Sequence, residues 1–373
     1  MLIGVPKEIK NHEYRVGLTP SSVRELTSHG HEVVVEHNAG GGIGAADHVY
    51  EKAGAKISSS AADIFSRADM IVKVKEPQAV ERAMLRPGQV LFTYLHLAPD
   101  PDQCNDLIKS SAICIAYETV TQPGGGLPLL APMSEVAGRM SIQAGAHSLE
   151  RAHGGMGVLL GGVAGVPPAK IVILGAGVVG TNAAQMAVGT GAIVVVIDRS
   201  IDALRKIDRM FNGRVITVFS NRDNVEQHVL SADLVIGGVL IPGAYAPRLI
   251  TRDMIGAMKP GSVIVDVAID QGGCAETSRP TTHAEPTYVV DKVVHYCVAN
   301  MPGGVPRTST YALNNATLPF TLALAEHGWK KALQADPHLL NGLNVFKGKV
   351  TCREVAEALG HAYVPAAEAI AAN

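Results

Sequence analysis

The chain has 373 residues, which is enough for about two domains at roughly 150 residues each. Its 32 Lys and Arg residues against 34 Asp and Glu give a formal net charge of −2, which excludes the strong positive field that nucleic acids and anionic membranes require of a partner. Glycine accounts for 39 residues, about 10% against a usual value of about 7%. This composition favours an α/β enzyme with many tight turns.

The first residues, the apolar runs and the cysteines indicate where the protein works and which sites are not expected. Lys7 and Glu8 bring charge before an apolar signal-peptide core could form, and there is no apolar run long enough to span a membrane. The five cysteines are odd in number, widely spaced and without a C-x-x-C pair. We therefore expect free thiols, a cytoplasmic location, no metal and no membrane partner.

Short β-rich runs alternate with helical stretches from the start of the chain. The first set of predicted strands is Leu2–Val5, Glu32–Glu36, Met70–Val74, Val90–Tyr94 and Ala112–Ala116. Helices are predicted between them, for example at Pro20–Ser28, where Thr19 can cap the first turn, Pro20 suits the first helical position and Gly30 ends the helix. This alternation is typical of βαβ units and mainly parallel sheets.

A glycine-rich loop at 122–128 predicts a hinge, and the helical pattern from Pro132 to about Arg151 predicts an interdomain helix. The second set of predicted strands is Ile171–Leu174, Ile193–Ile197, Val215–Phe219, Leu234–Leu240, Ser262–Val267 and Val294–Val298. A helical tail from about Tyr311 to Ala325 could pack back on the first domain. The predicted fold is α/β, with two doubly wound Rossmann-like domains of mainly parallel sheets joined by long interdomain helices.

The second strand set opens on a nucleotide-binding pattern. A strand runs into Gly175, Gly177 and Gly180, a helix follows, and the next strand ends at Asp198. The glycines allow a tight turn, close approach of a pyrophosphate and close helix packing, while the acid can bind the adenosine ribose. An acid at this position favours NAD over NADP, but the adjacent Arg199 could pair with a 2′-phosphate. The alternative is an ordinary glycine turn with a surface aspartate.

Polar side chains also follow the apolar strands, where ligands of open α/β sheets bind. These are Arg15, Lys73, Lys75 and His96 in the first strand set, and Asp270 and Asn300 in the second. Arginine and lysine suit the carboxylate of a small 2-amino or 2-oxo acid, and a histidine can exchange protons at the reacting carbon. Each residue type alone is ordinarily structural or solvent-exposed, so only the shared position favours a site.

Three other patterns are less informative. His29 and His31 have metal-like spacing, but they lie in a helix-ending turn without a nearby thiol or carboxylate, so a solvated turn is the prediction. The glycines at 154–162 lack the Lys-Ser/Thr ending of a phosphate loop and predict a hairpin or hinge. Cys274 lacks an adjacent base, so a buried thiol is expected.

Several long blocks resemble the alanine dehydrogenase family, which includes the nucleotide-binding subunit of proton-pumping transhydrogenase. They are 4–8 with 13–16, 72–77, 92–97, 131–135, 265–273 and 298–302. The resemblance implies reversible, NAD-dependent oxidative deamination of L-alanine to pyruvate and ammonia. It implies Arg15 and Lys75 as substrate-binding residues, and His96 and Asp270 as catalytic residues.

The resemblance also implies the cofactor contacts and the domain division. In addition to Gly175, Gly177 and Gly180, the residues implied to contact NAD are Ser134, Val178, Asp198, Ser220, Val239, Leu240, Val267, Ala268, Ile269, Asp270, Val298, Ala299, Asn300 and Met301. A discontinuous substrate domain would comprise 1–128 and 305–373, and the NAD domain 129–304. The family is typically hexameric, so a homo-oligomer is expected.

Three alternatives remain open at the level of sequence. The chain could be a dehydrogenase of a larger amino acid or of a saccharopine- or lysine-like substrate. It could instead be the soluble nucleotide-binding subunit of a proton-pumping transhydrogenase, although such a subunit would not need Arg15, Lys75 and His96 together. A silent NAD-binding regulator would bind NADH without turnover.

Overall fold

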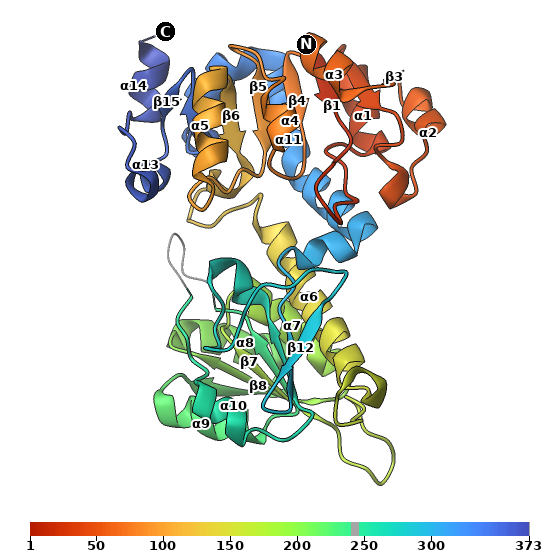
Figure 1. Cartoon of the computed structure of the whole chain (residues 1–373), viewed down its shortest axis with the longest axis vertical. Helices are drawn as coiled ribbons and strands as arrows, with labels where there is room; N and C mark the ends of the chain where they lie inside the picture. The colour runs from red at the N-terminus through yellow and green to blue at the C-terminus, as the bar shows by residue number, and fades with distance from the viewer. Residues whose placement is uncertain (240–245, 373) are drawn as a thin grey trace. The chain divides into compact units, whose positions relative to one another are not determined.

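The computed structural model describes residues 1–239 and 246–372, and the chain forms two compact units (Figure 1). Unit 1 combines Met1–Met133 with Val305–Asn373, and unit 2 is Ser134–Gly304. Helix α6, Ala131–Ser148, begins in unit 1 and continues into unit 2, and the long helix α11, Pro306–Ala335, begins where the chain re-enters unit 1.

Unit 1 is built on an eight-stranded sheet in the order β15-β14-β6-β5-β4-β1-β2-β3. Its strands are β1 Leu2–Val5, β2 Glu32–Glu36, β3 Lys56–Ser58, β4 Met70–Val72, β5 Val90–Thr93, β6 Ile113–Ala116, β14 Leu343–Phe346 and β15 Lys349–Val350. Strands β1 to β6 are parallel. β1 lies inside the sheet, and the order in which the strands follow one another reverses next to it, as in doubly wound folds. The tail adds β14 antiparallel to β6, so both ends of the chain build one sheet.

The remaining helices and turns of unit 1 connect these strands. They are α1 Pro20–Ser28, η1 Gly41–Ile43, α2 Asp47–Lys52, α3 Ala61–Arg67, α4 Ala79–Arg82, α5 Pro101–Ser110, η2 Tyr117–Thr119, α12 Pro337–Leu340, α13 Arg353–Leu359 and α14 Ala366–Ala371. Local sequence sets the bounds of α1, because Thr19 Oγ1 accepts the Ser22 N–H and Pro20 takes the first position. Gly30 follows the helix with a φ of 81°.

Unit 2 carries a seven-stranded sheet in the order β12-β13-β11-β10-β7-β8-β9. Its strands are β7 Lys170–Leu174, β8 Ile193–Asp198, β9 Val215–Phe219, β10 Leu234–Gly237, β11 Val263–Asp266, β12 Thr287–Val290 and β13 Val293–Tyr296. Six are parallel and repeat the doubly wound order, while β12 pairs antiparallel with β13 at the edge.

The helices of unit 2 beyond α6 are α7 Val178–Gly189, α8 Ile201–Phe211, α9 Arg222–Ser231 and α10 Arg252–Ala257, with 3₁₀ turns η3 Arg151–His153, η4 Val267–Gln271 and η5 Met301–Gly304. Alternate residues of β7 enter two separate hydrophobic clusters. Ile171 and Ile173 join one, and Val172 and Leu174 the other. Both faces of this sheet are therefore buried, which explains the continuous apolar runs of its strands.

The predicted fold class is confirmed by the two mainly parallel α/β sheets. The predicted strands occur with shifts of one or two residues at their ends, except that β4 and β10 are shorter. Sequence patterns did not predict β3, β12, β14 and β15. Each is an edge or near-edge strand of two to four residues, too short for a period to be visible.

Candidate active site

Arg15 is anchored in unit 1 by a neighbouring acid. Its Nε donates to Glu13 Oε1 at 2.7 Å and its Nη2 to Glu13 Oε2 at 2.6 Å, while Nη1 approaches Met133 Sδ at 3.1 Å. The residue is only 2% exposed. Burial opposes the charge, but the bonds and charge of Glu13 outweigh it, so the pKa of Arg15 is raised. The guanidinium is thus a fixed, permanently charged group.

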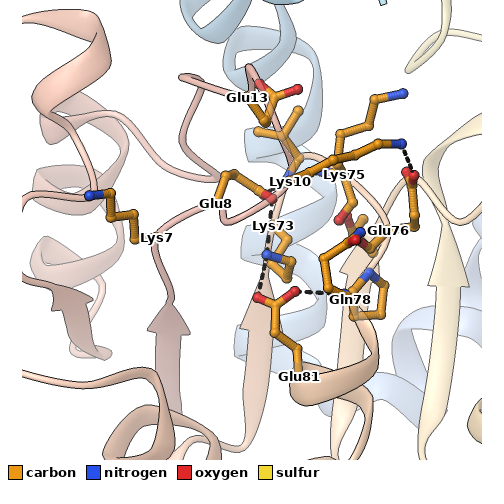
Figure 2. A network of polar contacts seen from close by, with 12 residues as sticks. Lys7, Glu8, Lys10, Glu13, Lys73, Lys75, Glu76, Gln78 and Glu81 are labelled. Carbon is orange, nitrogen blue, oxygen red and sulfur yellow. Dashed lines mark hydrogen bonds and ion pairs between the residues drawn. The ribbon is translucent and has the colours of Figure 1, made fainter.

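Lys73 and Lys75 follow β4, but the structure gives them different environments (Figure 2). Lys73 is fully buried, with Nζ 3.0 Å from Glu8 Oε2 and 2.7 Å from Glu81 Oε1. Burial lowers the pKa of Lys73, but the two carboxylates reverse this and raise it overall. Lys75 is half-buried. Of the two lysines, Lys73 is therefore structural and Lys75 is the one that can meet a ligand.

Glu8 links the buried lysine to the main chain of the predicted substrate lysine. Its Oε1 accepts the N–H of Val74 at 2.6 Å and that of Lys75 at 3.2 Å. Burial raises the pKa of Glu8 against the lowering effect of Lys73. Glu8 and Lys73 together hold the segment that carries Lys75.

His96 follows β5 as an exposed residue with a left-handed backbone φ of 49°, between the buried Leu95 and Leu97. Glu118 holds this segment, since its Oε1 accepts the N–H groups of Leu95 at 3.1 Å and His96 at 2.6 Å. The same oxygen lies 3.8 Å from His96 Nδ1. The imidazole stacks on Tyr94, with ring centroids 5.6 Å apart and planes at 6°. The ring is oriented while its edge remains accessible to solvent.

Three predicted substrate-side residues therefore share one region of unit 1. Tyr94 stacks on His96 and interacts electrostatically with Arg15, and Thr93 Oγ1 donates to the Lys75 carbonyl at 2.9 Å. The elements that precede these residues, β1, β4 and β5, are neighbours in the sheet. Their carboxyl ends bring two cations and one imidazole to the same edge.

The glycine turn of unit 2 has the geometry that a dinucleotide requires. Gly175 has a φ of 102°, and a Cβ there would lie 2.7 Å from the Gly238 carbonyl oxygen. A Cβ on Gly180 would lie 1.8 Å from the Gly175 carbonyl oxygen. Gly177 precedes α7, and no side chain in the described part of the chain caps that helix. Val178 begins the helix, so its first N–H groups can receive a pyrophosphate.

Asp198, at the end of β8, is hydrogen-bonded to the main chain of the glycine turn. Its Oδ2 accepts the Ala176 N–H at 2.7 Å and its Oδ1 the Ser200 N–H at 2.7 Å. The main chain of Ser220, after β9, donates to the Asp198 carbonyl at 2.9 Å. These bonds fix the carboxylate next to the glycine turn, where it can accept bonds from a ribose. Arg199 is exposed beside it.

A buried aspartate organises the loop that carries Asp270. Asp266 is fully buried and accepts from Cys274 N at 2.8 Å, from Ser278 Oγ at 2.6 Å and from Ala268 N at 3.2 Å. Asp270 is exposed in the turn that follows. A saturated buried carboxylate thus holds the loop and leaves Asp270 accessible for chemistry.

The other predicted cofactor residues of unit 2 follow strands or lie on α6. Val239 follows β10, Val267–Ile269 follow β11, Val298–Met301 follow β13, and Ser134 lies in the first turn of α6. Asn300 has a φ of 101°, and its carbonyl accepts from His283 Nε2 at 3.0 Å. Leu240 lies outside the described residues. The strand-end positions agree with the place where dinucleotides bind such sheets.

Sequence reasoning missed the residues that hold the site rather than form it, namely Glu8, Glu13, Glu81, Glu118 and Asp266. Only Glu13 had a local signal, two residues before Arg15. His29 pairs instead with the carboxylates of Glu25 and Glu326, and Cys274 is buried as expected. No helix among the described residues combines the length and apolarity that crossing a bilayer demands.

Taken separately, unit 2 has a dinucleotide-binding fold and unit 1 presents cationic groups and a histidine at its strand ends, which is the class of an amino- or oxo-acid dehydrogenase. The sequence model "Alanine dehydrogenase/PNT, N-terminal domain" matches residues 4–137, and "Alanine dehydrogenase/PNT, C-terminal domain" matches residues 141–353. The chain belongs to the alanine dehydrogenase/PNT family, which confirms the resemblance noted from the sequence.

Individual relatives agree with this assignment. Alanine dehydrogenase of Halomonas elongata is 63% identical over 370 residues, covering 99% of this chain and 100% of the relative. That of Mycolicibacterium smegmatis is 52% identical over 371 residues, covering 100% of both. A solved L-alanine dehydrogenase superimposes with a TM-score of 0.94 at 53% identity, covering 96% of this chain and 99% of that structure. A transhydrogenase from Sinorhizobium meliloti gives 0.80 at 28% identity, covering 95% and 99%.

Proposed function

We propose that the chain is an L-alanine dehydrogenase. The reaction converts L-alanine, NAD⁺ and water to pyruvate, ammonium, NADH and a proton, and runs in both directions. The observation that carries the proposal is the grouping of Arg15, Lys75 and His96 at one sheet edge of unit 1. The full-length likeness to alanine dehydrogenases, at 51–63% identity for three of them, supports the choice of substrate.

In this proposal Arg15 and Lys75 bind the substrate carboxylate. Glu13 holds the Arg15 guanidinium in one orientation, through Nε and Nη2. A fixed guanidinium lowers the entropy that binding must overcome. His96 exchanges the proton of the substrate nitrogen, or of the water that adds at the same carbon, and Glu118 Oε1 lies 3.8 Å from its Nδ1.

Unit 2 would hold NAD, which would supply the hydride acceptor for the reaction. The open turn at Gly175, Gly177 and Gly180 fits the pyrophosphate, and Asp198 fits the adenosine ribose. The carboxylate also disfavours a 2′-phosphate, which supports NAD over NADP. Asp270 is the second catalytic residue of the proposal, and its exposed carboxylate can orient water or stabilise an iminium.

The remaining expectations belong to the same proposal. The substrate domain comprises 1–128 and 305–373 and the NAD domain 129–304. The protein works in the cytoplasm as a homo-oligomer, a hexamer by likeness to its family, and its other partners are L-alanine, pyruvate and ammonia. Size-exclusion chromatography with light scattering measures the oligomer directly.

NADH absorbance tests the activity, with L-alanine and NAD in one direction and pyruvate, ammonium and NADH in the other. We expect turnover with alanine, little with bulky amino acids and little with NADP. His96→Ala and Asp270→Asn should lose turnover and keep NADH binding, measured by fluorescence. Wild-type turnover in either variant would contradict the assigned roles, and oxidation of a larger amino acid in preference to alanine would contradict the substrate.

A further inference from the structure

Three potential metal ligands gather in unit 2 where α6 ends, and none of them is among the residues assigned above. His147 Nδ1 lies 3.6 Å from Glu150 Oε1, and His153 Nδ1 lies 3.5 Å from Glu150 Oε2. One ligand atom from each of the three residues lies within 4.8 Å of the others, and all three residues are exposed. Neither the sequence nor the proposed function assigns a role to this cluster.

The backbone explains why these residues meet. The Glu150 N–H donates to the His147 carbonyl at 3.2 Å, and the His153 N–H to the Glu150 carbonyl at 3.0 Å. Two successive turns of three residues therefore separate the side chains, and side chains three residues apart are aligned in such turns. The spacing H-x-x-E-x-x-H thus becomes one cluster.

The turn is also fixed by its surroundings. Leu149 is fully buried, and Gly154 takes a left-handed φ of 88° after His153. A Cβ on Gly155 would lie 2.3 Å from the Leu149 carbonyl, so the chain folds closely back on itself there. The only cation within the sequence of the cluster, Arg151, donates to the Gly155 carbonyl at 3.4 Å rather than to Glu150. The three ligands are therefore held on a rigid turn.

The distances match those around a bound cation. Two ligand atoms about 2.0–2.1 Å from a tetrahedral Zn²⁺ lie about 3.4 Å apart. The nitrogen-to-oxygen distances of 3.5 and 3.6 Å are close to this value and longer than a hydrogen bond. The imidazole rings are also close, with centroids 3.8 Å apart. Two imidazole nitrogens therefore face one carboxylate at a spacing that suits one shared dication.

We propose that His147, Glu150 and His153 bind one transition-metal dication of the zinc type. Imidazole nitrogen selects such ions over Mg²⁺ and Ca²⁺, which prefer oxygen ligands. Three protein ligands leave at least one position for water. A cation bound there would tie η3 to the end of α6 and stabilise the folded unit by linkage, because the unfolded chain does not hold the three groups together. The inference does not depend on the proposed catalytic activity.

The test uses the full chain without an affinity tag, stripped of metal with EDTA and titrated with Zn²⁺ at pH 7.5 by calorimetry. We expect one equivalent to bind the wild type. His147→Ala and His153→Ala should each weaken it by about tenfold or more, since even the loss of a supporting partner commonly weakens metal sites by 10–100-fold. Binding of Cu²⁺ should give an electron paramagnetic resonance spectrum with two imidazole nitrogens.

His37→Ala is the matched control, because His37 is also exposed and lies 2.6 Å from a carboxylate oxygen of Asp47 but has no second histidine in its cluster. It should bind Zn²⁺ as the wild type does. Circular dichroism spectra and urea denaturation curves without metal, equal in all variants, report that each is folded. Unchanged Zn²⁺ affinity in the double variant H147A/H153A, or a Cu²⁺ spectrum with fewer than two imidazoles, would overturn the proposal.

Discussion

Replacing the buried lysine of unit 1 tests the electrostatic account of the substrate side most directly. Lys73→Met removes the ammonium group that lies 3.0 Å from Glu8 and 2.7 Å from Glu81 but keeps much of the side-chain volume. Glu8 and Glu81 are 6% and 1% exposed. Removing one partner of a buried ion pair destabilises a protein by about 3–5 kcal/mol. We expect a loss of that size at pH 8.

The loss should depend on pH, with a defined sign. Burial already raises the pKa of Glu8, and without Lys73 the opposing effect disappears, so the pKa rises further. A folded-state pKa above the unfolded value means that the folded state binds the additional proton, so stability is lost as pH rises. This loss accumulates only between the ordinary glutamate pKa of about 4.3 and the raised folded-state pKa of Glu8. Lowering the pH from 8 to 5.5 should therefore restore part of the stability that the variant loses.

Urea denaturation followed by tryptophan fluorescence measures this effect in the correct unit, because the single tryptophan of the chain, Trp329, lies on α11 in unit 1. Lys56→Met is the matched control, since Lys56 and Glu32 form an exposed pair with side chains 71% and 66% accessible. Exposed pairs of this kind contribute little to stability because solvent screens them. If Lys73→Met were no more destabilising than Lys56→Met, or if its loss did not change with pH, the reasoning would be refuted.

Two further predictions concern the two halves of the site. Gly180→Ala places a Cβ against the Gly175 carbonyl, so NADH affinity should fall by at least about tenfold in a fluorescence titration. The control is Gly189→Ala on the same helix, whose Cβ meets nothing within 4 Å and which should bind NADH normally. Equal NADH affinities of the two variants would contradict the close-packing role of Gly180. Glu118→Gln removes the charge beside His96 and weakens the acceptor of two main-chain N–H groups. Alanine turnover should therefore fall by about 10- to 100-fold, while NADH affinity is retained. Wild-type turnover in this variant would exclude Glu118 as a positioning residue.

Local patterns predicted the parts of the fold that are locally determined. The strand, glycine turn, helix and acid at Lys170–Asp198 lie in one continuous stretch. The positive φ of Gly175 and the approach of Gly180 to the Gly175 carbonyl are local requirements, whereas the approach of Gly175 to the Gly238 carbonyl is not. The strand-end rule also placed Arg15, Lys75 and His96 on one edge, because parallel strands align their carboxyl ends. That rule needs only the strand positions, which the apolar runs supply.

The carboxylates that bond to the site residues could not be predicted from the sequence, because they lie in distant segments of the chain. Lys73 and Lys75 occupy similar positions after the same strand. Because β4 ends at Val72, the alternation of side chains along a strand does not show which of the two lysines is buried. Only the structure brings Glu8, 65 positions away, against Lys73. In the same way Glu118 reaches His96 across 22 positions. The sequence thus gives the groups that can meet a ligand but not the carboxylates that hold them.

These carboxylates change how substrate capture should be understood. The charged groups around the substrate side, His96 apart, are Lys7, Glu8, Lys10, Glu13, Arg15, Lys73, Lys75, Glu76, Glu81 and Glu118. They comprise five cations and five anions, so the region is formally neutral, as the whole chain nearly is. A neutral region exerts little long-range attraction on an anion but can bind a zwitterion such as an amino acid through short contacts. In the proposed function, selectivity would then depend on the fixed geometry that Glu13 gives Arg15 and Glu8 gives the Lys75 segment. Salt should screen such short, partly buried contacts only weakly.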